Sequence, residues 1–244
     1  IKITAKFKTV TYTISYDLKD GSLEEGKTNP EEYTVESEDI VLNKPTKESY
    51  TFAGWTGTEL NGIVENVTIA KGSTGNREYI ANWTTSDYTI TYNLNGGTAT
   101  GNPNTYTIES DDINLNKPTK FGYTFTGWTG TELADKTEDV LIAKGSTGNR
   151  EYTANWTPTV YTITYQGLTQ EEETALNNPT EYTIETQAIT LNNPQDRRDS
   201  DNDLTERFVG WRENVSVSTN ITIPAELGNK IYEAVWVEVD PDVY

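Results

Sequence analysis

A long internal repeat constrains the fold of this chain more than any other feature of its sequence. The segment IAKGSTGNREYIANWT at 69–84 recurs with one substitution at 142–157, a shift of 73 residues. SYTFAGWTGTEL at 49–60 recurs at 122–133 with the same shift. Self-similarity at a fixed spacing indicates an array of similar folding units. We therefore expect several small units in tandem rather than one large domain.

A third and more divergent copy follows the first two. Phe208-Val209-Gly210-Trp211 matches Phe125-Thr126-Gly127-Trp128, and the ten additional residues in this interval fall within QDRRDSDNDLTER at 195–207. Ile3-Thr4-Ala5-Lys6-Phe7 matches the last strand expected in the second copy. The predicted organisation is residues 1–9 as the last strand of a truncated preceding repeat, repeats at 10–84, 85–158 and 159–239, and a tail at 240–244.

Alternation of apolar and polar residues predicts that each unit is mostly β. In the second copy Tyr88, Ile90 and Tyr92 alternate with Thr and Asn, which is typical of a half-buried strand. Asn95-Gly96-Gly97 follows as a turn, because glycine adopts positive φ without strain. Further strands are expected around 106–108, 113–115, 123–128, 140–142 and 152–156. A short helix or turn is expected near 98–104, 133–140 and 170–177, with Gln170–Leu176 as the best helix candidate.

Composition argues against several classes of function. Lys and Arg number 19 against 38 Asp and Glu, so the net charge of −19 repels phosphate backbones and anionic lipids. His and Cys are both absent, which excludes Ser–His and Cys–His catalytic pairs and Cys-based zinc sites. We therefore expect no enzyme, no nucleic-acid partner and no membrane insertion. Acidic pairs such as Glu24/Glu25 and Asp111/Asp112 are interpreted as surface charge rather than as an acid–base pair.

One pair of tryptophans recurs in each copy. An exposed indole face could stack on a sugar ring, whereas a buried one contributes a large apolar area to a core. Their regular place within alternating strands favours the core. The predicted structural core residues are Trp55, Trp83, Trp128, Trp156, Trp211 and Trp236.

The acidic insertion is a candidate calcium site. Asp199, Asp201 and Asp203 have the alternate spacing with which a loop begins to wrap a calcium ion, and Asp196 and Glu206 lie nearby. Leu204 stands where such a loop requires Gly, and Arg197 and Arg198 lie within the cluster. We therefore favour a solvated acidic loop with no cofactor and keep calcium as the alternative.

The Gly-rich segments at 72–76 and 145–149 have the composition of phosphate-binding loops but are interpreted as turns. No Lys-Ser/Thr follows their second glycine, which a phosphate loop requires. The lysine before each segment, Lys71 or Lys144, is a candidate for an intramolecular isopeptide bond to asparagine. A plain surface position is the other interpretation.

The combination of YTITYNLNGG at 88–97, GYTFTGWTG at 122–130 and IAKGSTGNREYTANW at 142–156 resembles the Listeria–Bacteroides repeat family, which includes the internalin B-repeats. The resemblance covers nearly the whole chain in three copies. It implies β-grasp-like small α+β units and a place in bacterial surface proteins, in tandem between an anchor and a functional head. The third copy departs from the pattern at Gln166-Gly167 and at 225–229.

From this resemblance we expect a mostly β chain of three tandem repeats in an elongated array. The expected function is a non-catalytic stalk or spacer on the bacterial cell surface that presents an adhesive domain. The alternative is a binding module that itself contacts a host protein or glycan. The chain is expected to be extracellular and to act as a monomeric rod.

Overall fold

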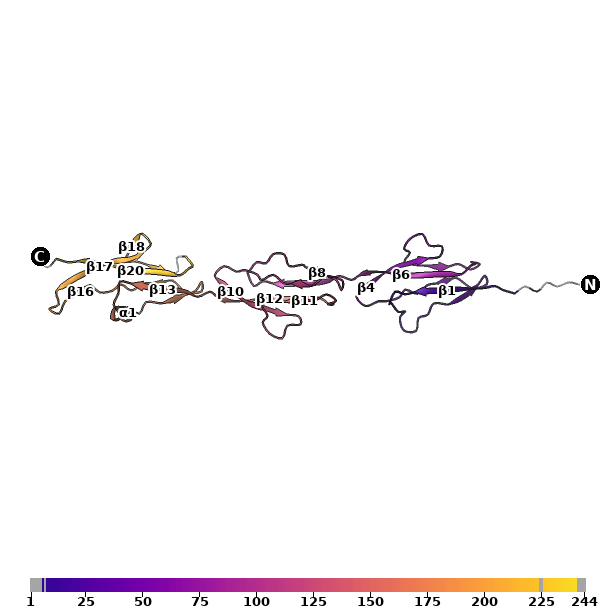
Figure 1. Ribbon diagram of the computed structural model, residues 1–244, viewed down its shortest axis with the longest axis horizontal. Coiled ribbons are helices and arrows are strands. Elements are labelled where there is room, and N and C mark those ends of the chain that lie inside the picture. Colours follow the sequence, from indigo (N-terminus) through magenta and orange to yellow (C-terminus); the bar gives the residue numbers. More distant parts are fainter. Residues whose placement is uncertain (1–5, 7, 224–225, 241–244) are drawn as a thin grey trace, which may run out of the picture. The chain divides into compact units, whose positions relative to one another are not determined.

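The computed structural model describes residues 6, 8–223 and 226–240. It is mostly β, with strands β1–β20 and the single helix α1 among the described residues (Figure 1). The strand expected at residues 3–7 lies outside the described residues except for Lys6, as does most of the tail at 240–244. By contacts the chain forms two compact units, which divide the second sequence repeat between them. Unit 1 comprises Ile1–Thr91, Pro103–Leu115 and Leu141–Glu151, and unit 2 comprises Tyr92–Asn102, Asn116–Val140 and Tyr152–Tyr244.

The first sheet has the strand order β2-β1-β6-β4. The first long strand, β1, and the last, β6, pair in parallel at the centre of this sheet, with Ile14 opposite Arg77. The outer strands β2 and β4 pair with β1 and β6, respectively, in the antiparallel sense. β3 and β5 form a separate two-stranded sheet. The strands are β1 (Thr11–Asp17), β2 (Glu32–Thr34), β3 (Ile40–Val41), β4 (Tyr50–Gly57), β5 (Thr68–Ile69) and β6 (Arg77–Thr85).

The second sheet repeats this order as β10-β12-β7-β8, again beside a small two-stranded sheet, β11-β9. Along β7 the even-numbered residues from Tyr88 to Tyr92 are buried or half-buried and the residues between them are exposed, as the alternation predicts. The strands are β7 (Tyr88–Asn93), β8 (Thr105–Tyr106), β9 (Ile113–Asn114), β10 (Tyr123–Gly130), β11 (Leu141–Ile142) and β12 (Arg150–Pro158).

The third sheet extends the pattern to β14-β13-β20-β17-β16, with β18 also paired to β17. The insertion at 195–207 is therefore not a simple loop, because it adds the edge strand β16 and lengthens β17. The strands are β13 (Tyr161–Gln166), β14 (Glu181–Tyr182), β15 (Ile189–Thr190), β16 (Arg197–Arg198), β17 (Leu204–Glu213), β18 (Ser216–Ser218), β19 (Thr222–Ile223) and β20 (Lys230–Glu238).

Helix α1 spans Gln170–Leu176, as predicted. Thr169 caps it: its hydroxyl accepts from the N–H of Glu172, and the Glu172 carboxylate accepts from the N–H of Thr169. The described residues of the first two copies form no helix, so the helical part expected of each unit is found in the third copy alone. The segment at 98–104 contains two residues that disfavour helix, Gly101 and Pro103, and lacks such a capping pair.

A β-bulge in the second-to-last long strand of each sheet determines which aromatic residues reach the core. The register shifts between Phe125 and Gly127, where glycine adopts a φ of +119°. The extra residue lets Phe125 and Trp128, three positions apart, point to the same face. The same shift occurs in β4 and β17. In the first sheet this face packs on a core of Ile14, Tyr33, Leu42, Trp55, Val67, Ile69, Tyr79 and Ala81.

Candidate functional site

The six tryptophans fall into two structural classes. Trp55, Trp128 and Trp211 have no exposed surface, so they offer no face to a sugar. The other three are half-buried, and each donates its indole N–H to the backbone carbonyl of the residue that directly follows the first strand of its sheet. These bonds run from Trp83 to Leu18 (3.1 Å), from Trp156 to Leu94 (3.0 Å) and from Trp236 to Gly167 (2.9 Å).

A phenylalanine connects the two tryptophans of each copy. Phe125 contacts both Trp128 and Trp156 edge-on, with ring centroids 5.5 Å apart in each case. Phe52 and Phe208 do the same in the other two sheets. Edge-to-face contacts between buried rings stabilise a core beyond the area that they bury. The indoles therefore belong to a three-ring cluster that recurs in each copy.

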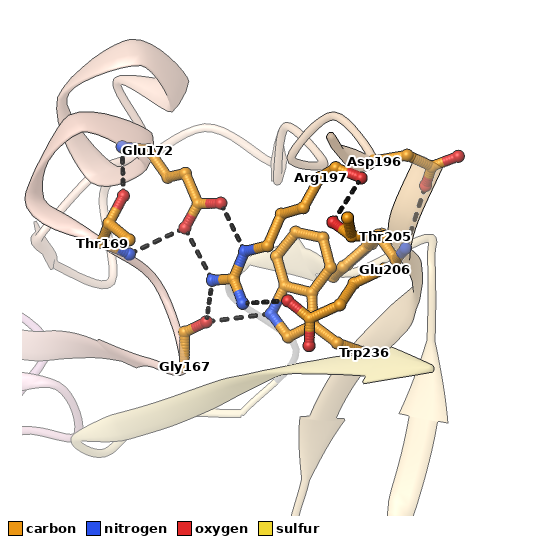
Figure 2. A network of polar contacts seen from close by, with 9 residues as sticks. Gly167, Thr169, Glu172, Asp196, Arg197, Thr205, Glu206 and Trp236 are labelled. Atoms are coloured by element: carbon orange, nitrogen blue, oxygen red, sulfur yellow. Dashed lines mark hydrogen bonds and ion pairs between the residues drawn. The ribbon is translucent and has the colours of Figure 1, made fainter. Parts of the chain in front are cut away.

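The acidic insertion is organised around Arg197, which sequence analysis treated only as an interfering charge. Figure 2 shows its guanidinium between the carboxylates of Glu172 and Glu206. Two nitrogens of Arg197 donate to Glu172 at 2.8 and 2.9 Å, and a third donates to Glu206 at 2.9 Å. One of them also donates to the carbonyl of Gly167 at 3.0 Å. The network thus joins α1, β16 and β17.

The same guanidinium lies over the ring of Trp236, 3.9 Å from its centroid. A cation at this distance is attracted by the electron-rich face of the ring. Hydrogen bonds from Arg197 lower the pKa of Glu172, against the opposing effect of partial burial, and those to Glu172 raise the pKa of Arg197. One face of Trp236 is therefore already occupied by a side chain of the chain itself.

Of the proposed calcium ligands, Asp199 already has other partners. One carboxylate oxygen of Asp199 accepts from the N–H of Asp201 and from that of Asp203, both at 2.9 Å. Asp196 accepts from the N–H of Phe208, and Glu206 binds Arg197. These bonds close the turn between β16 and β17. Across the ranges that the structure describes, no three acidic side chains converge as a metal site would require.

The lysines proposed for an isopeptide bond lie in surface ion pairs. Lys71 contacts Glu38 at 2.6 Å and Lys144 contacts Asp111 at 3.0 Å, with side chains more than half exposed. The carboxylate of Asp112 accepts from the N–H of Lys144. The acidic pair Asp111/Asp112 thus holds one end of the Gly-rich turn, and exposed pairs of this kind contribute about 0–1 kcal/mol.

A cleft of about 400 Å³ lies beside the Arg197 network. Ala175, Leu176 and Pro194 supply its apolar lining, while Asn192, Gln195 and Asp196 supply polar groups. Helix α1 and the insertion form much of its wall, and neither has a counterpart in the described residues of the first two copies. No helix in the described part of the chain is long and apolar enough to cross a membrane.

Comparison with known families decides where these repeats belong. The model of the Listeria-Bacteroides repeat domain matches residues 12–78 and 88–151, more than half of the chain. This chain belongs to the Listeria-Bacteroides repeat domain family. Internalin H of Listeria monocytogenes serovar 1/2a (strain ATCC BAA-679 / EGD-e) is 28% identical over 151 residues, which are 61% of this chain. The similarity spans 26% of the length of internalin H.

In this Listeria-Bacteroides repeat protein the two matched ranges contain the near-identical copies. The third copy, at 159–239, lies outside both ranges. It also carries α1, β16, the Arg197 network and the cleft. The sequence analysis identified the insertion but missed the network. The spacing Thr169-x-x-Glu172, which is typical of the start of a helix, was the available signal for the position of Glu172.

Proposed function

We propose that this chain is a non-catalytic tandem-repeat segment of a bacterial cell-surface protein, where it serves as a spacer that presents an adhesive domain. The observation that carries the proposal is the family match to two consecutive copies, together with the similarity to an internalin. The burial of one tryptophan per copy supports it, because these large rings stabilise the units and leave no face for a ligand.

We further propose that each copy is a β-grasp-like unit and that the three copies follow one another in an extended monomeric array. The central parallel pairing of the first and last long strands, as in β1 with β6 and β13 with β20, supports a β-grasp arrangement. The short connections between copies, such as Ser86 and Asp87 between β6 and β7, support limited freedom between neighbouring copies.

A replacement experiment in the parent surface protein tests the spacer role. Residues 10–239 are exchanged for an unrelated rigid spacer of equal length, and separately the second copy, 85–158, is deleted. A spacer predicts that adhesion survives the exchange and weakens with the shortened chain. Loss of adhesion after an exchange that keeps length and surface display would overturn the proposal.

A binding module is the second candidate, and one observation favours it. Ile231 and Val237 on β20 are more than half exposed, whereas the equivalent positions on β12 are Glu151 and Thr157. Exposed apolar residues that gather on one surface are typical of interaction sites. Replacing Ile231 and Val237 with Glu and Thr installs residues that the second copy already accommodates. Loss of host-cell binding in this variant, with unchanged stability, would favour the binding module over the spacer.

A further inference from the structure

The same turn follows the second strand of each sheet. In the first copy the N–H of Thr34 donates to the hydroxyl of Ser37 and the N–H of Ser37 donates back to the carbonyl of Thr34, both at 3.0 Å. The second copy repeats both bonds between Thr107 and Ser110, and the third between Thr183 and Thr186. At its third position each turn exposes a glutamate: Glu36, Glu109 or Glu185.

Two of these glutamates bind a tyrosine of the preceding copy. The hydroxyl of Tyr50 donates to Glu109 at 2.9 Å, within unit 1. The hydroxyl of Tyr123 donates to Glu185 at the same distance, within unit 2. Each hydrogen bond raises the pKa of its tyrosine. One donor–acceptor pair therefore recurs at both junctions, each time from the first residue of a long strand to the turn of the next copy.

Further contacts at each junction also recur. The N–H of Ser86 donates to the carbonyl of Ser49, and the N–H of Thr159 donates to the carbonyl of Gly122. Gly122 also lies directly against Ile184, the residue before Glu185: a Cβ on this glycine would come within 2.6 Å of the isoleucine Cδ1. A small residue beside the tyrosine is thus required for the close approach.

The turn of the first copy carries the same groups. Among the described residues the carboxylate of Glu36 has no partner. Val35 is 39% exposed, whereas its equivalents Ile108 and Ile184 are half-buried. In the first copy a carboxylate without a hydrogen-bond donor thus lies beside an aliphatic side chain that is more exposed than its equivalents. This is the arrangement expected of a junction whose tyrosine-bearing copy is missing.

We propose that the turn Thr34–Ser37 is a docking surface for a further repeat of the same family that precedes residue 10. Its occupant presents a tyrosine hydroxyl to Glu36 and a small residue, serine or glycine, to Val35. The proposal stands whether the array serves as a spacer or as a binding module.

The junction has a direction, which the third copy makes clear. Two residues before the phenylalanine of the bulged strand, the first two copies have Tyr50 and Tyr123, and the third has Glu206. Glu206 binds Arg197 within its own sheet. The third copy can accept a tyrosine but does not offer one, so this type of junction ends with it.

Distances between spin labels in the full chain test the junction. Because the chain has no cysteine, labels can be introduced at Glu25→Cys with Asp135→Cys across the first junction, and at Asp135→Cys with Glu171→Cys across the second. Tyr50→Phe should broaden the first distance distribution and leave the second narrow, and Tyr123→Phe should do the reverse. If both distributions keep their wild-type width in both variants, the hydrogen bonds do not hold the junctions and the proposal fails.

An extended chain tests the docking surface itself. A copy of residues 85–158 is joined ahead of Val10, which brings a tyrosine equivalent to Tyr123 to the first copy. Labels across the new junction should give a narrow distribution that is lost in Glu36→Ala and retained in the control Glu48→Ala, which changes another exposed glutamate of the first copy. A broad distribution in the extended wild type, or a narrow one in Glu36→Ala, would overturn the proposal.

Discussion

Truncation of Trp128 is the most informative single perturbation of a repeat. Its ring has no exposed surface and lies 5.5 Å from Phe125, 6.0 Å from Tyr92 and 6.5 Å from Tyr152, measured between ring centroids. A tryptophan buries roughly 150–250 Å². At about 25 cal/mol per Å² this burial stabilises the fold by about 4–6 kcal/mol.

Two further effects modify this figure. The indole N–H of Trp128 is buried and has no hydrogen-bond partner among the described residues, which costs about 1–3 kcal/mol in the wild type. The cavity left in Trp128→Ala adds a cost of its own, so we expect a total loss of about 3–5 kcal/mol. A folded copy of about 73 residues is expected to have a free energy of unfolding of roughly 4–11 kcal/mol. The variant therefore loses much of the stability of its own copy.

A comparison of phenylalanine variants separates packing from the polar effect. Trp128→Phe removes the unpaired N–H, whereas Trp211→Phe breaks a hydrogen bond from the indole to the Asn193 side chain of 3.0 Å. We therefore expect Trp211→Phe to cost about 1–3 kcal/mol more than Trp128→Phe. Urea unfolding measures the differences, and amide hydrogen exchange assigns them to one copy. An unchanged unfolding curve for Trp128→Ala, with loss of glycan binding instead, would refute the core assignment.

The other predictions concern the third copy. Because the Arg197 hydrogen bonds depress the folded-state pKa of Glu172, their stabilisation is complete above the ordinary pKa of about 4.5 and is lost as the pH falls through the folded value. Thermal unfolding between pH 7 and pH 3 should therefore show an acid-dependent loss in the third copy that is smaller in Arg197→Ala, and equal acid sensitivity in both proteins would contradict this. Calcium at millimolar concentration should shift the melting temperature no more than sodium chloride of the same ionic strength, because Asp199 already accepts two backbone N–H groups. A calcium-specific rise that disappears in Asp199→Asn/Asp201→Ala would show a metal site in the insertion.

Much of the fold follows from local patterns. The alternation in Tyr88–Tyr92 and the helix candidate at Gln170–Leu176 each depend on neighbouring residues, so the sequence predicts β7 and α1 directly. In a regular strand, residues three positions apart lie on opposite faces of the sheet. Strict alternation therefore does not predict that Phe125 and Trp128 share a face, which they do because a bulge lies between them. Gly127 was the available signal, since its positive φ suits a bulge.

The Arg197 network could not be predicted in the same way. Arg197 binds Glu172, 25 residues earlier, and covers Trp236, 39 residues later, and no periodic pattern relates these positions. Only the tertiary fold brings the insertion, the helix and the last strand together. The role proposed for Glu36 likewise could not be predicted from the sequence. It is recognised only by comparison with the equivalent turns, in which Glu109 and Glu185 accept hydrogen bonds from tyrosines.

Small-angle X-ray scattering tests the central claim that this chain is a tandem array of separate small units. A compact globule of 244 residues has a radius of gyration of about 18 Å. The array predicts a radius well above this value and a maximum dimension far beyond that of such a globule, both unchanged over a range of protein concentrations. A compact profile with a radius near 18 Å would contradict the account.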